Sequence, residues 1–110
     1  MDNRINDKDL EFVTGGAAAT GNLQSASNML RLALSLFTDD MPGSVRTRIA
    51  RTADIIDRGD TDVSYFNRSI NIAINELYSF RDTLEGNPDK QCVVDEIIAN
   101  LDLALMLINS

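Results

Sequence analysis

The chain has 110 residues, which suffices for one domain with a modest core. Its formal charge of −7 disfavours binding to nucleic acids and to anionic membranes, because phosphate-rich partners repel an acidic surface. Cys92 is the single cysteine, so an intramolecular disulfide is excluded and lanthionine-type thioether rings are limited to one.

The sequence has no secretory signal of the general pathway, because no apolar run lies between a basic start and a small-residue cleavage site. The longest apolar stretch, 103–108, is far too short to cross a bilayer. If the protein leaves the cell, we therefore expect it to need a dedicated exporter.

The first sixteen residues form a short charged segment that ends at the pair Gly15 and Gly16. About two helical turns are predicted over residues 7–13, with Leu10 and Val13 on one face. Isolated helices this short are marginal in water, so we expect the segment to order only when a receptor groove binds its apolar face. Two consecutive residues without Cβ then let an extended backbone enter a narrow protease cleft.

This segment resembles the double-glycine leader of bacteriocin-type secreted peptide and protein precursors, and the resemblance is confined to residues 1–16. The resemblance implies recognition by the papain-like cysteine peptidase domain of an ABC exporter, with cleavage between Gly16 and Ala17. In this family, glutamate is more common than aspartate at the position of Asp9. The residues that carry the resemblance are Ile5, Asp9, Leu10, Val13, Gly15 and Gly16.

An ordinary flexible joint is the alternative interpretation of Gly15 and Gly16. In either case we expect a small-residue spacer at 17–22 and a four-helix domain at 23–110. The first helix of that domain is predicted at about 22–37, where apolar residues recur at three- and four-residue steps.

The next two helices carry recognisable start and stop signals. Pro42 suits an early helical position, and the helix that follows is predicted to run toward Arg58 and to stop at Gly59. A third helix is predicted to start at 60–62 and to stop at Gly86.

The last helix is predicted to open at Asn87 and Pro88, a cap followed by a pre-set backbone angle. Alternating apolar residues at 70–75 permit a strand, but the apolar pattern extends over about twenty residues, which favours a helix. The predicted fold is therefore all-α, a small antiparallel four-helix bundle preceded by a short flexible or helical leader.

The sequence shows no arrangement typical of an enzyme. It has no histidine, Cys92 has no obvious base nearby in the sequence, and a glycine-rich phosphate loop is missing. We expect no catalytic activity and no cofactor. Arg46, Arg48 and Arg51 form the basic cluster, but no aromatic residue is interleaved, so nucleic-acid binding is not expected.

A cluster of acidic residues near the end of the second helix raises the alternative of a calcium site, because calcium prefers several carboxylate ligands. Their spacing follows no known metal loop, and Arg51 and Arg58 lie close enough to pair with them. We therefore expect local ion pairs at a solvated helix end and no metal. The cluster comprises Asp54, Asp57, Asp60 and Asp62.

Two helices hold more apolar residues than one buried stripe needs. The extra residues are Leu32 and Leu36 in the first helix and Leu103 and Leu107 in the last. Because the chain has few aromatic residues, we expect the core to use them all. The alternative is a surface left for a partner or a homo-oligomer.

The predicted function is that of a bacteriocin-like secreted protein, cytoplasmic as a precursor and secreted after leader removal. Its cargo would act on other cells through an unidentified target protein or cell surface, with antibacterial or signalling activity. An intracellular helical interaction module, such as a bacteriocin-immunity-type protein, is the alternative; its resemblance is architectural only.

Overall fold

The structure is a computed structural model that describes the backbone of residues 16–110 and the side chains from residue 21 onward. It contains four α-helices and, within the described residues, no β-strand. The all-α prediction is confirmed, including the helix across the alternating residues 70–75. The helices are α1 (Gly16–Ser35), α2 (Gly43–Asp57), α3 (Val63–Asp82) and α4 (Pro88–Ile108).

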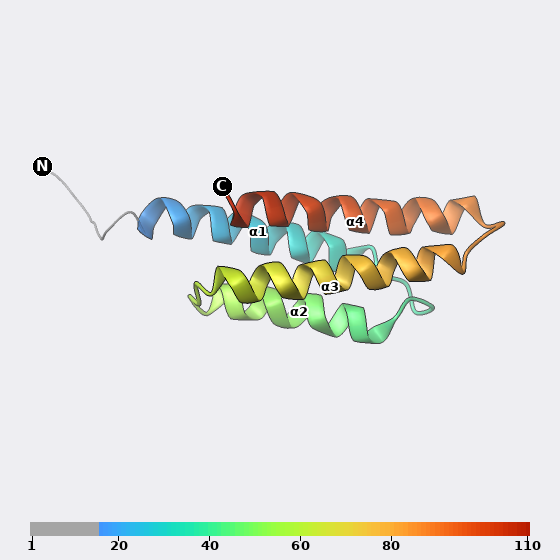
Figure 1. The fold of residues 1–110 in the computed structure, drawn as a ribbon, viewed down its shortest axis with the longest axis horizontal. Helices are drawn as coiled ribbons and strands as arrows, with labels where there is room; N and C mark the ends of the chain where they lie inside the picture. Colours follow the sequence, from blue (N-terminus) through green and yellow to red (C-terminus); the bar gives the residue numbers. More distant parts are fainter. Residues whose placement is uncertain (1–15) are drawn as a thin grey trace, which may run out of the picture.

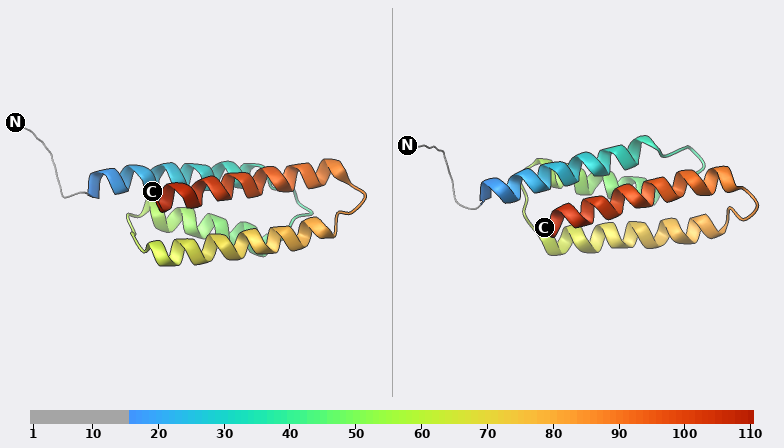
Figure 2. Two further views of the ribbon diagram at one scale, coloured as in Figure 1. Left: turned by 45° about the horizontal axis from the view of Figure 1, so that its top comes forward. Right: turned by 90° about the horizontal axis from the view of Figure 1, so that it is seen from above.

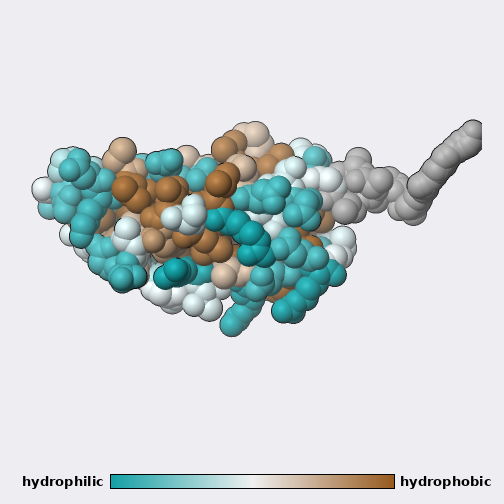
Figure 3. Space-filling view, turned by 180° about the vertical axis from the view of Figure 1, so that it is seen from behind, coloured by the Kyte–Doolittle hydropathy of each residue, from teal (hydrophilic) through white to brown (hydrophobic). Residues whose placement is uncertain are grey.

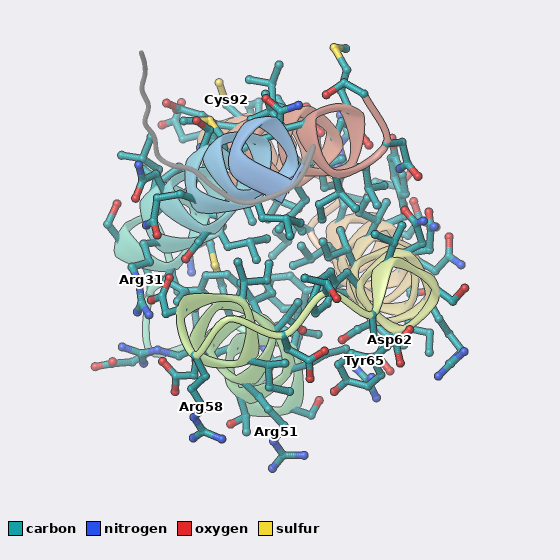
Figure 4. All side chains as sticks on the ribbon, turned by 90° about the vertical axis from the view of Figure 1, so that its left-hand side faces the viewer. Arg31, Arg51, Arg58, Asp62, Tyr65 and Cys92 are labelled. Atoms are coloured by element: carbon teal, nitrogen blue, oxygen red, sulfur yellow. The ribbon has the colours of Figure 1, made fainter. Side chains whose placement is uncertain are left out.

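The four helices run alternately up and down (Figures 1 and 2), and the end-on view shows them at the corners of a square (Figure 4). Each helix packs against the next one in sequence, and α4 packs back against α1. α1 and α3 lie on one diagonal of the square, and α2 and α4 lie on the other. The predicted antiparallel four-helix bundle is therefore confirmed.

Most helix ends follow the local signals in the sequence, but α3 ends at Asp82 and not at the predicted stop, Gly86, which lies in the turn before α4 with a φ of 89°. The Asp62 carboxylate accepts a hydrogen bond from the Tyr65 backbone N–H at 3.1 Å and caps α3. The Asn87 side chain accepts one from the Lys90 N–H at 3.3 Å and caps α4. Gly59 follows α2 with a φ of 96°, a left-handed conformation that favours glycine and turns the chain toward α3.

The first helix differs from its prediction at both ends. α1 begins at Gly16 where the sequence predicted a start near Asn22, so the backbone of the expected spacer is helical. Alanine has the highest helix propensity, and three alanines at 17–19 extend the helix outward. α1 ends at Ser35, and Phe37 belongs to a closing turn in which its N–H donates to the Leu34 carbonyl at 3.1 Å.

The interior of the bundle is one continuous apolar core to which every helix contributes. Its side chains recur at the three- and four-residue steps that place them on the inner face of each helix. Burying one large apolar side chain stabilises the fold by roughly 1.5–3 kcal/mol. The largest fully buried apolar side chains are Phe66, Leu30, Ile49, Ile70, Leu77, Ile97, Leu101, Val45 and Val94.

Two buried hydroxyl groups join α2 to α3. Thr52 Oγ1 donates to the Arg48 carbonyl oxygen at 2.9 Å, which uses its single proton. The Ser69 hydroxyl lies 2.8 Å from Thr52 Oγ1 and therefore donates to it. An unpaired buried hydroxyl costs about 1–3 kcal/mol. A rotation of α2 or α3 about its axis that separated these two groups would therefore be unfavourable.

Adjacent residues of α3 give a direct test of the core. Leu77 is fully buried and Tyr78 is 51% exposed. Leu77→Ala is expected to lower the free energy of unfolding by about 2–5 kcal/mol, because it leaves a cavity, whereas Tyr78→Ala is expected to change it by about 1 kcal/mol or less. Urea denaturation followed by circular dichroism measures both, and equal losses would contradict this assignment of the core.

Candidate functional site

The predicted leader falls largely outside the described part of the chain. Ile5, Asp9, Leu10, Val13 and Gly15 lie in residues 1–15, so their roles remain predictions. Gly16 and Ala17 are described, and they are the first two residues of α1. The expected cleavage site is thus the first peptide bond of this helix.

The N-terminal end of α1 projects beyond the other three helices (Figure 1). The Asn22 side chain donates to the Ser110 hydroxyl at 3.1 Å, which marks where α1 comes level with the end of the chain. A Cβ added at Gly21 would meet no atom within 4 Å. Residues 16–21 therefore extend past the bundle end as an overhanging helical segment, which we call the α1 overhang.

The α1 overhang is the part of α1 whose unwinding costs the least free energy. The first four N–H groups of a helix have no intrahelical acceptor, so its first turn frays readily. The apolar core of the described residues begins at Leu23, so unwinding residues 16–21 removes none of its buried side chains. Unwinding this segment would give a protease an extended strand while every described core side chain stays buried.

The acidic cluster joins α1 to α2. The Arg31 guanidinium of α1 contacts Asp54 at 3.1 Å and also pairs with Asp57. The Ser27 hydroxyl donates to Asp57 Oδ1 at 2.7 Å. The sequence pointed to Arg51 and Arg58 as partners, and this was wrong for Asp54 and Asp57, because the real partner is distant in sequence and adjacent only in the fold.

The other members of the acidic cluster and its expected partners have different positions. The Asp60 carboxylate accepts the Asp62 N–H at 3.1 Å, so both residues shape the turn that leads into α3. Arg51 and Arg58 point outward from the bundle in the end-on view (Figure 4). Within the described residues, no group of three or more His, Cys, Asp or Glu side chains is arranged to hold a metal ion.

A small cavity lies where α1 meets the α2–α3 turn. Its volume is about 110 Å³, which is well below the roughly 300–1,000 Å³ of typical small-molecule sites. It therefore fits a few waters or one side chain. Its lining residues are Leu23, Gln24, Ile56, Asp57, Gly59, Asp60 and Thr61.

The extra apolar residues of α1 and α4 are not all in the core, contrary to expectation. Leu32 is 50% exposed and Leu103 is 45% exposed, while Leu36 and Leu107 are half-buried. Figure 3 shows the side of the bundle formed by α1 and α2, where apolar atoms gather along the middle and polar atoms lie toward the ends. Sequence periodicity missed this exposure, because each of the two helices is apolar around more than one face.

Comparisons of the chain with models of protein families, with curated proteins and with solved structures found no match. Among the described helices, none is both long enough and apolar enough to cross a membrane.

The Arg31 contact makes Asp57 the residue to test by pH. Arg31, and then Ser27, stabilise the charged carboxylate and hold the pKa of Asp57 below its ordinary value of 3.8. Since the pKa is lower in the folded than in the unfolded chain, the stabilisation is complete above the ordinary pKa and disappears as pH falls through the folded value. Urea denaturation between about pH 6 and pH 2.5 is expected to show a smaller acid-induced loss of stability in Asp57→Asn than in the wild type.

Asp102→Asn is the matched control, because Asp102 is an exposed carboxylate with no ion pair to any other described residue. Its acid-induced loss is expected to equal that of the wild type. The same loss in all three proteins would contradict a role for the Asp57 carboxylate in joining α1 to α2.

Proposed function

We propose that the chain is the precursor of a secreted protein, in which residues 1–16 are a double-glycine leader cut after Gly16 by a peptidase-containing ABC exporter. Residues 17–110 are then the cargo, a helical bundle that acts on other cells by an antibacterial or signalling activity. The observation that best supports this proposal is the α1 overhang, because the bond between Gly16 and Ala17 lies in a turn that projects beyond the bundle.

The position of the core adds support. The buried apolar residues of the described chain all lie at or after Leu23, so a cargo that starts at Ala17 keeps every one of them. The α1–α4 contact between Asn22 and Ser110 is kept as well. Cleavage at the proposed bond therefore leaves the bundle intact.

Export through a narrow channel requires the cargo to unfold, and the bundle has few features that would resist this. Cys92 is the single cysteine of the chain, so no intramolecular disulfide holds the helices together. The ion pairs between helices are largely solvent-exposed, and such pairs contribute about 0–1 kcal/mol each. Stability thus rests mainly on one small apolar core.

The proposed cleavage is tested by intact mass and N-terminal sequencing of the protein in the culture supernatant and lysate of its producer. We expect the secreted form to begin at Ala17. Gly16→Val is expected to abolish cleavage, because a branched side chain obstructs the narrow protease cleft. Leu10→Lys is expected to reduce cleavage at least tenfold through loss of leader recognition.

Gly21→Ala is the matched control, since it changes a glycine of the same helix where an added Cβ meets open space. It is expected to leave cleavage unchanged. Full-length chain found only inside the cell would overturn the proposal.

A helical interaction module of the bacteriocin-immunity type is the second candidate. The exposed Leu32 of α1 and Leu103 of α4 support it, because these helices pack against each other and exposed apolar patches mark protein–protein contact sites. The same mass measurement separates the two candidates, because the module retains residues 1–16 and stays in the cell.

A further inference from the structure

The positive charge of this acidic protein is concentrated in one part of the described chain. Residues 44–75 contain five arginines and four aspartates, whereas residues 76–110 contain two basic and seven acidic residues. An anionic partner therefore meets the least repulsion around α2 and the start of α3.

The four aspartates of this region already have partners. The carboxylates of Asp54 and Asp57 pair with Arg31 on the α1 side of the bundle. The carboxylates of Asp60 and Asp62 each accept a backbone N–H where the chain enters α3. By contrast, none of the five arginines forms an ion pair with another described residue. They are Arg46, Arg48, Arg51, Arg58 and Arg68.

Three of these arginines lie on the outer side of α2. Arg51 and Arg58 are about two helical turns apart, and Arg48 is about one turn before Arg51, so all three share one side of the helix. The end-on view shows Arg51 and Arg58 pointing away from α1 and α4 (Figure 4). Arg46 is not part of this group, because it lies about three turns before Asp57 and therefore on the α1 side.

α3 adds an aromatic ring beside these arginines. The hydroxyl oxygen of Thr52 in α2 lies 2.8 Å from that of Ser69 in α3, and the two helices are antiparallel. Tyr65, about one turn before Ser69, is therefore level with Ile55. The Arg68 guanidinium lies over the Tyr65 ring, with its central carbon 5.8 Å from the ring centre. In Figure 4 the Tyr65 side chain is on the same outer side as the labelled arginines of α2.

We call this surface the α2/α3 face. It combines guanidinium groups with two half-buried apolar side chains that pack on the core. Arginine and tyrosine are enriched in protein–protein interfaces, and an arginine can bind a carboxylate through two parallel hydrogen bonds. The face comprises Arg48, Arg51, Ile55 and Arg58 of α2 and its end, and Tyr65 and Arg68 of α3.

The charges along α3 limit the length of an anionic partner. Arg48 and Arg58 are about 15 Å apart along the helix axis, a span that an extended peptide covers with about five residues. Beyond this span α3 carries Glu76 and Asp82, which repel a longer anion. A nucleic-acid duplex or an anionic bilayer extends over both regions, whereas a short acidic peptide segment contacts the arginines alone.

We propose that the α2/α3 face binds a short acidic segment of a partner protein. Aspartate or glutamate carboxylates of that segment pair with Arg48, Arg51 and Arg58, and an apolar side chain of the segment packs on Tyr65. The inference does not depend on whether residues 1–16 are cut.

Its test is a titration of the isotope-labelled full chain followed by the chemical shifts of its backbone amides. The probe is a pentapeptide with two glutamates on each side of a leucine, and the control peptide has glutamine in place of every glutamate. The glutamate peptide is expected to shift signals of the α2/α3 face saturably, and less at about 0.5 M salt than at about 0.05 M, because salt screens exposed charges. Absent or unsaturable shifts, shifts centred on another surface, or equal binding of the glutamine peptide would overturn the proposal.

A double variant tests the arginines themselves. Arg51→Gln combined with Arg58→Gln is expected to weaken binding of the glutamate peptide about tenfold or more, because two charged hydrogen-bond donors are lost. The matched control combines Arg81→Gln with Lys90→Gln, which removes the same charge outside the face. The control is expected to bind as the wild type does, and circular dichroism checks that both variants stay helical. Equal weakening in both variants would show that only net charge matters and would refute the site.

Two further probes separate an acidic peptide from phosphate-bearing partners. A DNA duplex and phosphatidylglycerol vesicles are each mixed with the full chain under the same conditions. Neither is expected to bind as tightly as the glutamate peptide. Tighter binding of either probe that is lost on combining Arg51→Gln with Arg58→Gln would reject the acidic segment as the occupant of the α2/α3 face.

Discussion

The packing of the first helix against the last is the contact on which the rest of the bundle depends. α1 and α4 share the most extensive helix–helix contact in the described structure, and they close the square that the hairpin connections leave open. Their residues are far apart in sequence, so forming this contact carries the largest loop-closure cost of the fold. The side-chain contacts Asn22–Ser110 and Asp40–Lys90 hold the pair at its two ends. Core packing supplies the attraction between these ends, and the polar contacts mark the register.

This register also determines where α1 leaves the bundle. α4 ends at Ile108, and Ser110 lies level with Asn22, so α4 does not cover the earlier residues of α1. At this end of the bundle α1 therefore extends beyond α4, and this extension is the α1 overhang.

The sequence predicted the parts of the fold that depend on local chemistry. Gly59, Asp62, Asn87 and Pro88 act within a few residues of themselves, and the helix boundaries they predict are close to those observed. The start of α1 was missed because small residues suit both a spacer and a helix, and sequence spacing cannot separate the two. Residues 1–15 lie outside the described part of the chain, so the fold does not test the leader prediction. The Arg31 contact was missed because it depends on how α1 and α2 pack. The exposure of Leu32 and Leu103 was missed because α1 and α4 are each apolar around more than one face.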